Sequence, residues 1–247
     1  MFRSLILATA STALAFSIAG AAAAHEIRAE KSPRVPAAFD IVHAKITAQE
    51  RWLEFHMHVS GKAGQSHPAR TGKMAGSKTF AYVWPTSLNS AAAGFASDKG
   101  ILALTVTSHP DFDDTPLFDE NGDGRFDNDG NVWHAHWVVL VKDEACGPGA
   151  LKVRDIPKGA TPKMPPTWPG FPLYLDSPGY GPVLKQANVT VRVPFSNAKA
   201  LKDVHFDGVT AGLRINVNLH NPLFCVSDVF KVASGDLSLP GRVKPAK

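Results

Sequence analysis

The sequence predicts an all-β protein, an antiparallel β-sandwich of the Ig-like or jelly-roll-like kind, with long loops and little helix. Three observations lead to this prediction. Apolar and polar residues alternate with a period of two in eight separate segments. Gly, Pro, Asn and Asp, which favour turns, fill the stretches between those segments. The helix candidates are short, at 90–95 and 197–202. Eight strands with so little helix are typical of a sandwich or a barrel, and we expect the sandwich.

Length and composition fit a single soluble globular domain. The chain has 247 residues, of which 44% are hydrophobic and 19% are charged, and one all-β domain of this size is common. The formal charge is only +4, and no cluster of Lys and Arg accompanies it. We therefore expect no nucleic-acid partner.

Residues 1–24 have the layout of a secretory signal peptide. Arg3 precedes an apolar run that ends in small residues, and Ala22 and Ala24 fit the usual cleavage rule. Cleavage would make His25 the first mature residue and leave one domain at 25–247. No later apolar run is long enough to span a membrane. The sequence thus predicts a periplasmic or secreted protein.

Eight segments are predicted as strands: 41–47, 52–59, 79–84, 101–107, 132–141, 189–195, 213–219 and 226–232. In the first pair, alternation puts His43 on one face with His56 and His58. A tight turn at Gln49 and Glu50 would pair residues whose numbers sum to 99, opposing His43 to His56. We expect these three histidines to cluster and to be candidate ligands of a transition metal.

A second histidine group lies near the middle of the chain. His134 and His136 share one face of a predicted strand, where two imidazoles can converge on one ion. His109 ends the preceding strand and would return beside them if the two strands pair. The sequence predicts a three-nitrogen metal site here. Imidazole ligands suit Cu²⁺ or Zn²⁺, and the sequence does not choose between them.

The stretch 119–130 is an acidic loop with oxygen side chains at alternate positions. Its expected calcium ligands are Asp119, Asn121, Asp123, Arg125 through its carbonyl, Asp127 and Asp129. The run D-x-N-x-D-G resembles the calcium loops of EF-hands, dockerins and thrombospondin type 3 repeats. Gly130 stands where an EF-hand has its bidentate Glu, so Asp127, Asp129 or the upstream Asp111, Asp113 and Asp114 could supply the missing carboxylate. The resemblance implies a structural Ca²⁺.

An N-terminal histidine after a signal peptide is a further candidate ligand. The amine and imidazole of His25 could chelate one copper ion. This resembles the histidine brace of periplasmic copper carriers of the CopC type and of copper polysaccharide monooxygenases. The resemblance implies a copper site at the mature N-terminus, whereas cleavage at any other residue would remove it.

Two further features complete the prediction. Cys146 and Cys225 form an even pair in a chain that we expect to be exported, so they should form a disulfide. The stretch 147–182 is a long Pro, Gly and aromatic loop that either covers a sheet edge or walls a site. Its aromatic residues are Trp168, Phe171, Tyr174 and Tyr180.

The sequence favours an exported metal-binding protein that holds a His-ligated copper or zinc ion and a structural calcium, for metal carriage or buffering. Its partners would be metal ions and another periplasmic metalloprotein. One alternative is a periplasmic metalloenzyme that uses the same histidines. The other is a calcium-stabilised adhesion or glycan-binding module that uses the aromatic residues of 147–182. Motifs of serine hydrolases, P-loop proteins, dinucleotide-binding proteins and HExxH proteases are absent from the sequence, so catalysis is an open question.

Overall fold

The structure, a computed structural model, describes residues 25–196, 201, 203–219 and 222–245. The signal-peptide prediction at 1–24 and most of the helix candidate at 197–202 lie outside these residues. The described chain is almost entirely β, as the sequence predicts. Its two short helices are 3₁₀ turns, η1 (Ser90–Ala93) and η2 (Glu144–Cys146). Among the described residues, no helix is both long and apolar enough to cross a membrane.

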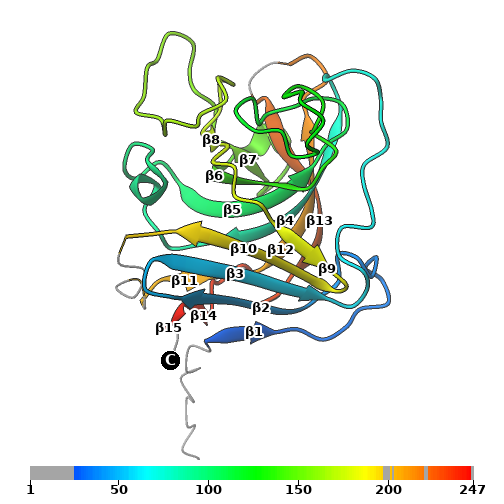
Figure 1. Cartoon of the computed structure of the whole chain (residues 1–247), viewed down its shortest axis with the longest axis vertical. Coiled ribbons are helices and arrows are strands. Elements are labelled where there is room, and N and C mark those ends of the chain that lie inside the picture. The colour runs from blue at the N-terminus through cyan, green and yellow to red at the C-terminus, as the bar shows by residue number, and fades with distance from the viewer. Residues whose placement is uncertain (1–24, 197–200, 202, 220–221, 246–247) are drawn as a thin grey trace, which may run out of the picture.

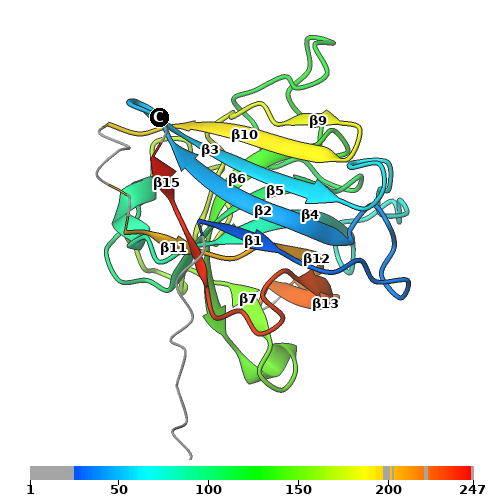
Figure 2. The ribbon, with the colours of Figure 1, turned by 90° about the horizontal axis from the view of Figure 1, so that it is seen from below.

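One sheet, here called the open sheet, has the order β1-β2-β3-β10-β9, with β15 pairing in parallel with β2. Its strands are β1 (Glu26–Arg28), β2 (Ile41–Ala48), β3 (Trp52–Val59), β9 (Val183–Lys185), β10 (Asn188–Pro194) and β15 (Lys244–Pro245). Figure 1 shows this sheet beneath the rest of the molecule, and Figure 2 shows it from below. A two-stranded pair of β11 (His205–Phe206) and β14 (Gly241–Arg242) lies nearby (Figure 1).

The second sheet closes on itself as a six-stranded barrel in the order β5-β4-β12-β13-β7-β6, with β6 returning to β5. Its strands are β4 (Lys78–Pro85), β5 (Ile101–Ser108), β6 (His134–Lys142), β7 (Leu151–Val153), β12 (Val209–Ile215) and β13 (Phe224–Val232). The short β8 (Leu175–Asp176) pairs with β6 outside this circuit. The all-β prediction is confirmed, whereas the sandwich holds only in part, because one of its two layers is a barrel.

Two separate apolar cores follow from this arrangement. The larger core lies between the open sheet and the outer face of the barrel, where Phe55 meets Trp84 and Trp137 edge to face at 5.9 and 5.8 Å. The smaller core lies inside the barrel and includes Val83 and Leu213. Barrel strands are therefore apolar on both faces.

The register of the first hairpin differs from the expectation. Ala48 pairs with Leu53 and Lys45 with His56, so paired numbers sum to 101 rather than 99. Gln49 N–H donates to the Trp52 carbonyl, so the two-residue turn falls one position later than predicted. His43 consequently pairs with His58 and not with His56. The predicted strand 213–219 is also wrong by four residues, because β12 covers Val209–Ile215.

The predicted disulfide is present between Cys146 and Cys225, with Cα atoms 5.6 Å apart. It links η2 to β13 beside the point where β13 and β7 complete the barrel. That closure rests on a single pair, Cys225 with Lys152. The disulfide therefore fastens the barrel where its backbone pairing is weakest.

Candidate metal centre

Four buried side chains come together at one end of the barrel: His109, Asp114, His134 and His136. One ligand atom from each lies within 4.8 Å of all the others, and each residue is 1–3% exposed. Asp114 Oδ1 lies 3.1 Å from Nε2 of both His109 and His134. It lies 3.3 Å from Nε2 of His136. The Nε2 atoms of His109 and His134 are 2.9 Å apart.

Strand geometry places the three imidazoles. β5 and β6 pair so that Thr107 is opposite His134 and Thr105 is opposite His136. Side chains alternate along a strand, so both histidines face the barrel interior while Trp137 enters the larger core. His109 directly follows β5 and continues the same inward series of odd-numbered residues.

The loop between β5 and β6 places the carboxylate. Its ends are joined where His109 N–H donates to the Gly130 carbonyl at 2.6 Å. Asp113 Oδ2 accepts from Asp129 N–H at 2.6 Å, which ties the two arms of the loop together next to Asp114. The Asp114 carbonyl accepts from Ser177 Oγ at 2.5 Å. Asp114 is thus held from both sides, by its own loop and by the segment after β8.

Each imidazole is oriented through its second nitrogen. His109 Nδ1 lies 2.9 Å from the Phe112 carbonyl and His134 Nδ1 lies 2.7 Å from the Val132 carbonyl. Carbonyls only accept, so both Nδ1 atoms carry the proton. His136 Nδ1 lies 3.1 Å from Ser177 Oγ, whose own proton goes to a carbonyl, so this Nδ1 is also a donor. In the neutral rings, all three Nε2 lone pairs therefore point toward the same centre.

This arrangement calls for a positive charge at its centre. Neutral imidazoles would direct three lone pairs and a carboxylate oxygen at one another across 2.9–3.3 Å, and His136 Nε2 has no hydrogen-bond partner. Burial alone would raise the pKa of Asp114, but its interactions with His109 and His136 outweigh burial and hold that pKa well below its usual range. A proton or a metal ion can satisfy the centre, and only a metal ion can bind all four atoms together.

The donor set and the distances from Asp114 to the three imidazoles fit a tetrahedral ion. Bonds of about 2.0–2.1 Å at tetrahedral angles separate neighbouring donors by about 3.3 Å. Asp114 Oδ1 is 3.1–3.3 Å from all three nitrogens, so none of them lies opposite it across the centre. A square plane needs such an opposite donor. The Nδ1 hydrogen bonds supply the orienting contacts that metal-bound histidines ordinarily have.

The structure brings His109, His134 and His136 together as the sequence predicts. Asp114 joins them, although the spacing predicts it only as a spare carboxylate for the acidic loop. The sequence contains a signal for Asp114 as a ligand, because it lies only five residues after His109, in the loop that begins where β5 ends. Ser177 carried no signal, since it reaches the centre from a distant segment through the pairing of β8 with β6.

The histidines of the open sheet form a different group. His43, His56 and His58 share one face, as expected, and the rings of His43 and His56 are 5.8 Å apart. They face other partners: His43 Nε2 meets Glu26 at 3.0 Å, while His56 and His58 both contact Asn188 Oδ1. These three do not gather into a metal-binding group within the described chain. His25 is exposed and does not join either group.

The acidic loop is organised by its own backbone. The Asp119 carboxylate accepts from the N–H groups of Gly122, Asp123 and Gly124. The Arg125 guanidinium pairs with Asp127 at 3.1 Å. Asp129 is fully buried and accepts from Glu120 N–H instead of facing the loop centre. Asn121 Oδ1 accepts from Asp123 N–H, and the carboxylates of the described loop do not converge three together as the ligands of the metal centre do. Calcium here stays a prediction from the spacing.

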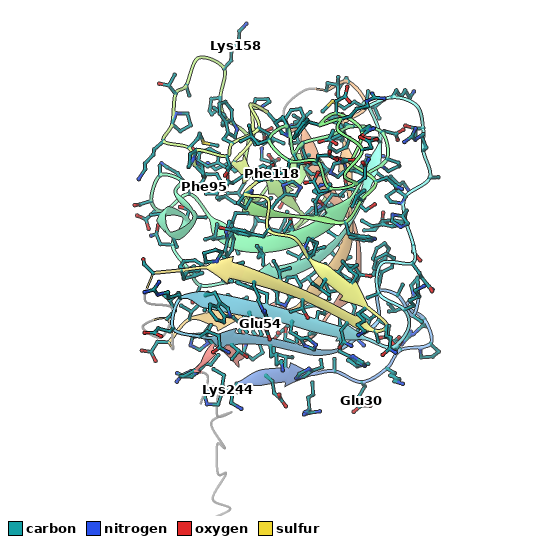
Figure 3. The ribbon with its side chains drawn as sticks, in the orientation of Figure 1. Glu30, Glu54, Phe95, Phe118, Lys158 and Lys244 are labelled. Carbon is teal, nitrogen blue, oxygen red and sulfur yellow. A yellow bond between two sulfur atoms is a disulfide. The ribbon has the colours of Figure 1, made fainter. Side chains whose placement is uncertain are left out.

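The segment 147–182 both covers a strand edge and supports the centre. β8 covers part of the β6 edge, and Ser177 follows it directly. Tyr174 is buried, Phe171 and Tyr180 are partly buried, and only Trp168 reaches 37% exposure among the four aromatic residues. Phe118, which Figure 3 labels, directly precedes the acidic loop and packs on Gly179 of the segment 147–182. Tyr174 therefore packs inward, Phe171 and Tyr180 do so in part, and among the four aromatic residues Trp168 alone is exposed.

Fold and centre together define an all-β protein in which a closed barrel carries a buried His₃Asp cluster able to hold a metal ion. Comparison with protein-family models, with curated proteins and with solved structures finds no match to the chain. The inference about function therefore rests on the residues and their geometry.

Proposed function

We propose that this chain is an exported zinc-binding protein whose ion is held by Nε2 of His109, His134 and His136 and by Oδ1 of Asp114. One observation carries the proposal: all four donor atoms converge, and every Nδ1 is occupied as a donor, so that the lone pair of every Nε2 faces the common centre. The absence of an opposite partner for Asp114 favours Zn²⁺ over a planar Cu²⁺ site.

Metal analysis of protein purified without an affinity tag or chelator tests this proposal. The structure provides a matched pair of variants, because the chain has two His-x-His strands. His134→Ala with His136→Ala should abolish binding of one zinc per chain. His56→Ala with His58→Ala removes as many imidazoles from the open sheet and should leave it intact. Equal zinc content in the two double variants, or copper in preference to zinc, would contradict the proposal.

The degree of burial bears on whether the ion is carried or retained. All four ligands are at most 3% exposed, so a partner protein cannot reach the ion without the barrel or its loops opening. We therefore propose a resident ion, in place of the carriage or buffering that the sequence favours. Zinc transfer to a metal-free acceptor protein should proceed at a rate independent of acceptor concentration. A rate proportional to acceptor concentration would support carriage.

Export is supported by the leader at 1–24 and by the disulfide, because disulfides persist in oxidising compartments. Intact mass of the protein from the periplasm or medium should show the leader removed and two hydrogens fewer than the reduced chain. A first residue of His25 would keep the copper-brace prediction open, and any other first residue would end it.

A metalloenzyme is the second candidate, because His109, Asp114 and His136 line a cavity inside the barrel. Acid–base catalysis needs a further group near the metal. Of the described residues that line this cavity, Lys142 and Asp228 are the other titratable groups, and both are exposed. This lining favours binding over catalysis. Zinc-dependent hydrolysis of an apolar ester that is lost in the His134→Ala, His136→Ala variant would reverse that preference.

A further inference from the structure

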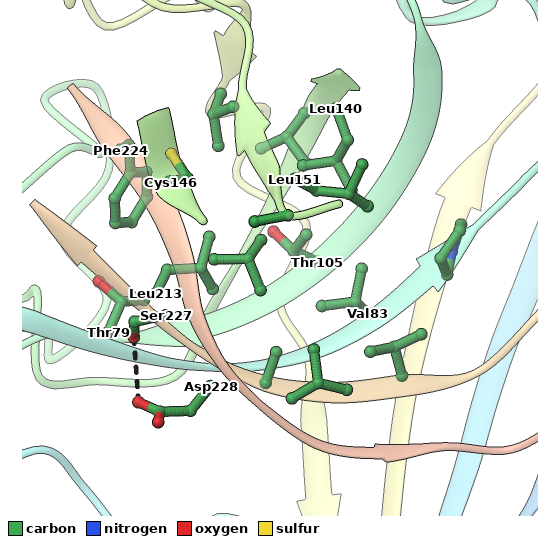
Figure 4. Close-up of a pocket in the computed structure, with 18 of the residues that line it drawn as sticks. Thr79, Val83, Thr105, Leu140, Cys146, Leu151, Leu213, Phe224, Ser227 and Asp228 are labelled. Carbon is green, nitrogen blue, oxygen red and sulfur yellow. Dashed lines mark hydrogen bonds between the residues drawn. The ribbon is translucent and has the colours of Figure 1, made fainter. Parts of the chain in front are cut away.

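The interior of the barrel is not filled. A cavity of about 500 Å³ lies between its strands, within the size range of small-molecule sites. Figure 4 shows Val83, Thr105, Leu140, Leu151 and Leu213, from five different strands, arranged around the same space. Small barrels normally fill their interior with side chains. Here the short side chain of Ala211 leaves part of the space open.

The cavity changes from polar to apolar along its length. Pairing between β5 and β6 gives successive inward rows of Thr107 with His134, Thr105 with His136, Ala103 with Val138, and Ile101 with Leu140. The first two rows carry hydroxyls and imidazoles beside the candidate metal centre. The last two are aliphatic. A ligand that matches this gradient has a polar head and an apolar body.

Two hydroxyls at the polar end lack partners. Thr79 Oγ1 and Thr105 Oγ1 are buried without a hydrogen bond, and both side chains line the cavity. Phe80 pairs with Ser108, which puts Thr79 next to His109 across the strands. A buried hydroxyl ordinarily has a hydrogen-bond partner. These groups can donate to an acceptor inside the cavity, next to the three imidazoles.

The cavity reaches solvent at the seam between β13 and β7. β13 and β7 share one residue pair, so beyond that pair the wall of the cavity is formed by loops and not by paired strands. Several cavity-lining residues there are exposed: Lys142, Pro148, Gly149, Ser227, Asp228 and Val229. A small molecule can therefore enter with its apolar body at the seam and its head at the metal end.

We infer that the barrel binds a small aliphatic or aromatic carboxylate, with its apolar body in the cavity and its carboxylate at the metal ion. A carboxylate is the head group that meets both demands, because one oxygen can bind the ion as a fifth donor beside the four protein ligands while the other accepts from the threonine hydroxyls. The aliphatic end of the cavity can bind an apolar molecule. This inference rests on the proposed zinc centre for its head group and on the cavity alone for its body.

Isothermal titration of zinc-loaded and metal-free protein with hexanoate, octanoate and decanoate tests the inference. Affinity for zinc-loaded protein should rise about fourfold for each added methylene until the cavity is full. Decanoate should bind zinc-loaded protein at least tenfold more tightly than metal-free protein. Decanol, which shares the body but lacks the carboxylate, should show little dependence on zinc.

Three variants assign the two ends of the site. Ala211→Phe fills the cavity and should abolish decanoate binding while zinc remains bound, whereas Ala92→Phe on the exposed η1 turn should change neither. Thr105→Val removes one hydroxyl and should weaken decanoate several-fold without weakening decanol, and Thr105→Ser should restore it. Should Ala211→Phe fail to fold, Val138→Ala enlarges the same space and should shift the preferred chain length upward.

The outcomes separate this inference from the proposed function. Zinc binding without decanoate binding, or decanoate binding that Ala211→Phe leaves unchanged, overturns the cavity site alone. Equal decanoate affinity with and without zinc overturns the head-group assignment. Absence of zinc binding overturns the proposed function and the head group together, while the effect of Ala211→Phe on decanol still decides the cavity.

Discussion

At the scale of single residues, the centre depends on side chains that would not themselves touch the ion. The Ser177 hydroxyl donates a hydrogen bond to the Asp114 carbonyl and accepts one from His136 Nδ1, so it fixes the position of one ligand and the orientation of another. Ser177→Ala should lower zinc affinity about 10–100-fold, the usual cost of losing such a partner. Competition with a chelator of known affinity measures this. Ser238→Ala, on the surface, is the control, and equal affinities in both variants would remove Ser177 from the centre.

Gly130 shows how tightly the loop closes over His109. A Cβ at this position would lie 1.8 Å from the Phe112 carbonyl oxygen and 2.8 Å from His109 Nδ1. Gly130→Ala should therefore push His109 away, costing about 1–3 kcal/mol of stability and weakening zinc. Gly122 has open space around it but a positive φ, so Gly122→Ala strains only the loop. Zinc titration should show weaker binding in Gly130→Ala and not in Gly122→Ala, while chemical denaturation measures the stability of each variant. Unchanged zinc affinity in Gly130→Ala would contradict this prediction.

At the scale of elements, the barrel seam is the weakest part of the second sheet. The Cys146–Cys225 disulfide spans a sequence separation of 79 residues, and in the chain-entropy model such a link contributes about 4 kcal/mol. Reduction should lower stability by that order. It should also speed amide exchange in β7 and β13 more than in β2 and β3, as hydrogen-exchange mass spectrometry can show. Uniform acceleration across both sheets would mean that the disulfide does not fasten the seam in particular.

The acidic loop has a test of its own. Its oxygen side chains alternate as calcium ligands do, although the described loop binds them to its own N–H groups. The spacing predicts that millimolar Ca²⁺ raises the Tm and that Asp123→Ala removes this increase. Asp203→Ala, an exposed acid elsewhere, should keep it. If Ca²⁺ raised the Tm equally in the wild type, Asp123→Ala and Asp203→Ala, the loop would be a solvated turn and not a calcium site.

The sequence predicts those features that depend on residues close together in the chain, and it does not predict those that depend on contacts between distant segments. The alternation of residue types along the chain located β2, β3, β5 and β6, because the face that each side chain takes depends only on its position among neighbouring residues. It could not show the barrel, since closure depends on β7, a three-residue strand without a periodic pattern. The inward face of β6 was readable from His134 and His136. Their carboxylate partner and Ser177 come from loops, whose conformation is set by tertiary contacts.

At the scale of the whole molecule, the centre and the smaller core belong to one barrel, so metal binding and folding should be linked. A ligand that binds only the folded state stabilises it by about 2.7 kcal/mol at a free concentration 100 times its Kd. Zinc should therefore raise the free energy of unfolding of the wild-type protein by about this amount in urea titrations. The His134→Ala, His136→Ala variant should show no increase, and the His56→Ala, His58→Ala variant should match the wild type. Because imidazoles must lose their protons to bind an ion, the zinc increment should shrink as the solution is acidified, while the metal-free protein lacks this increment at any pH. An increment that persists in the His134→Ala, His136→Ala variant would place the stabilising ion elsewhere in the chain.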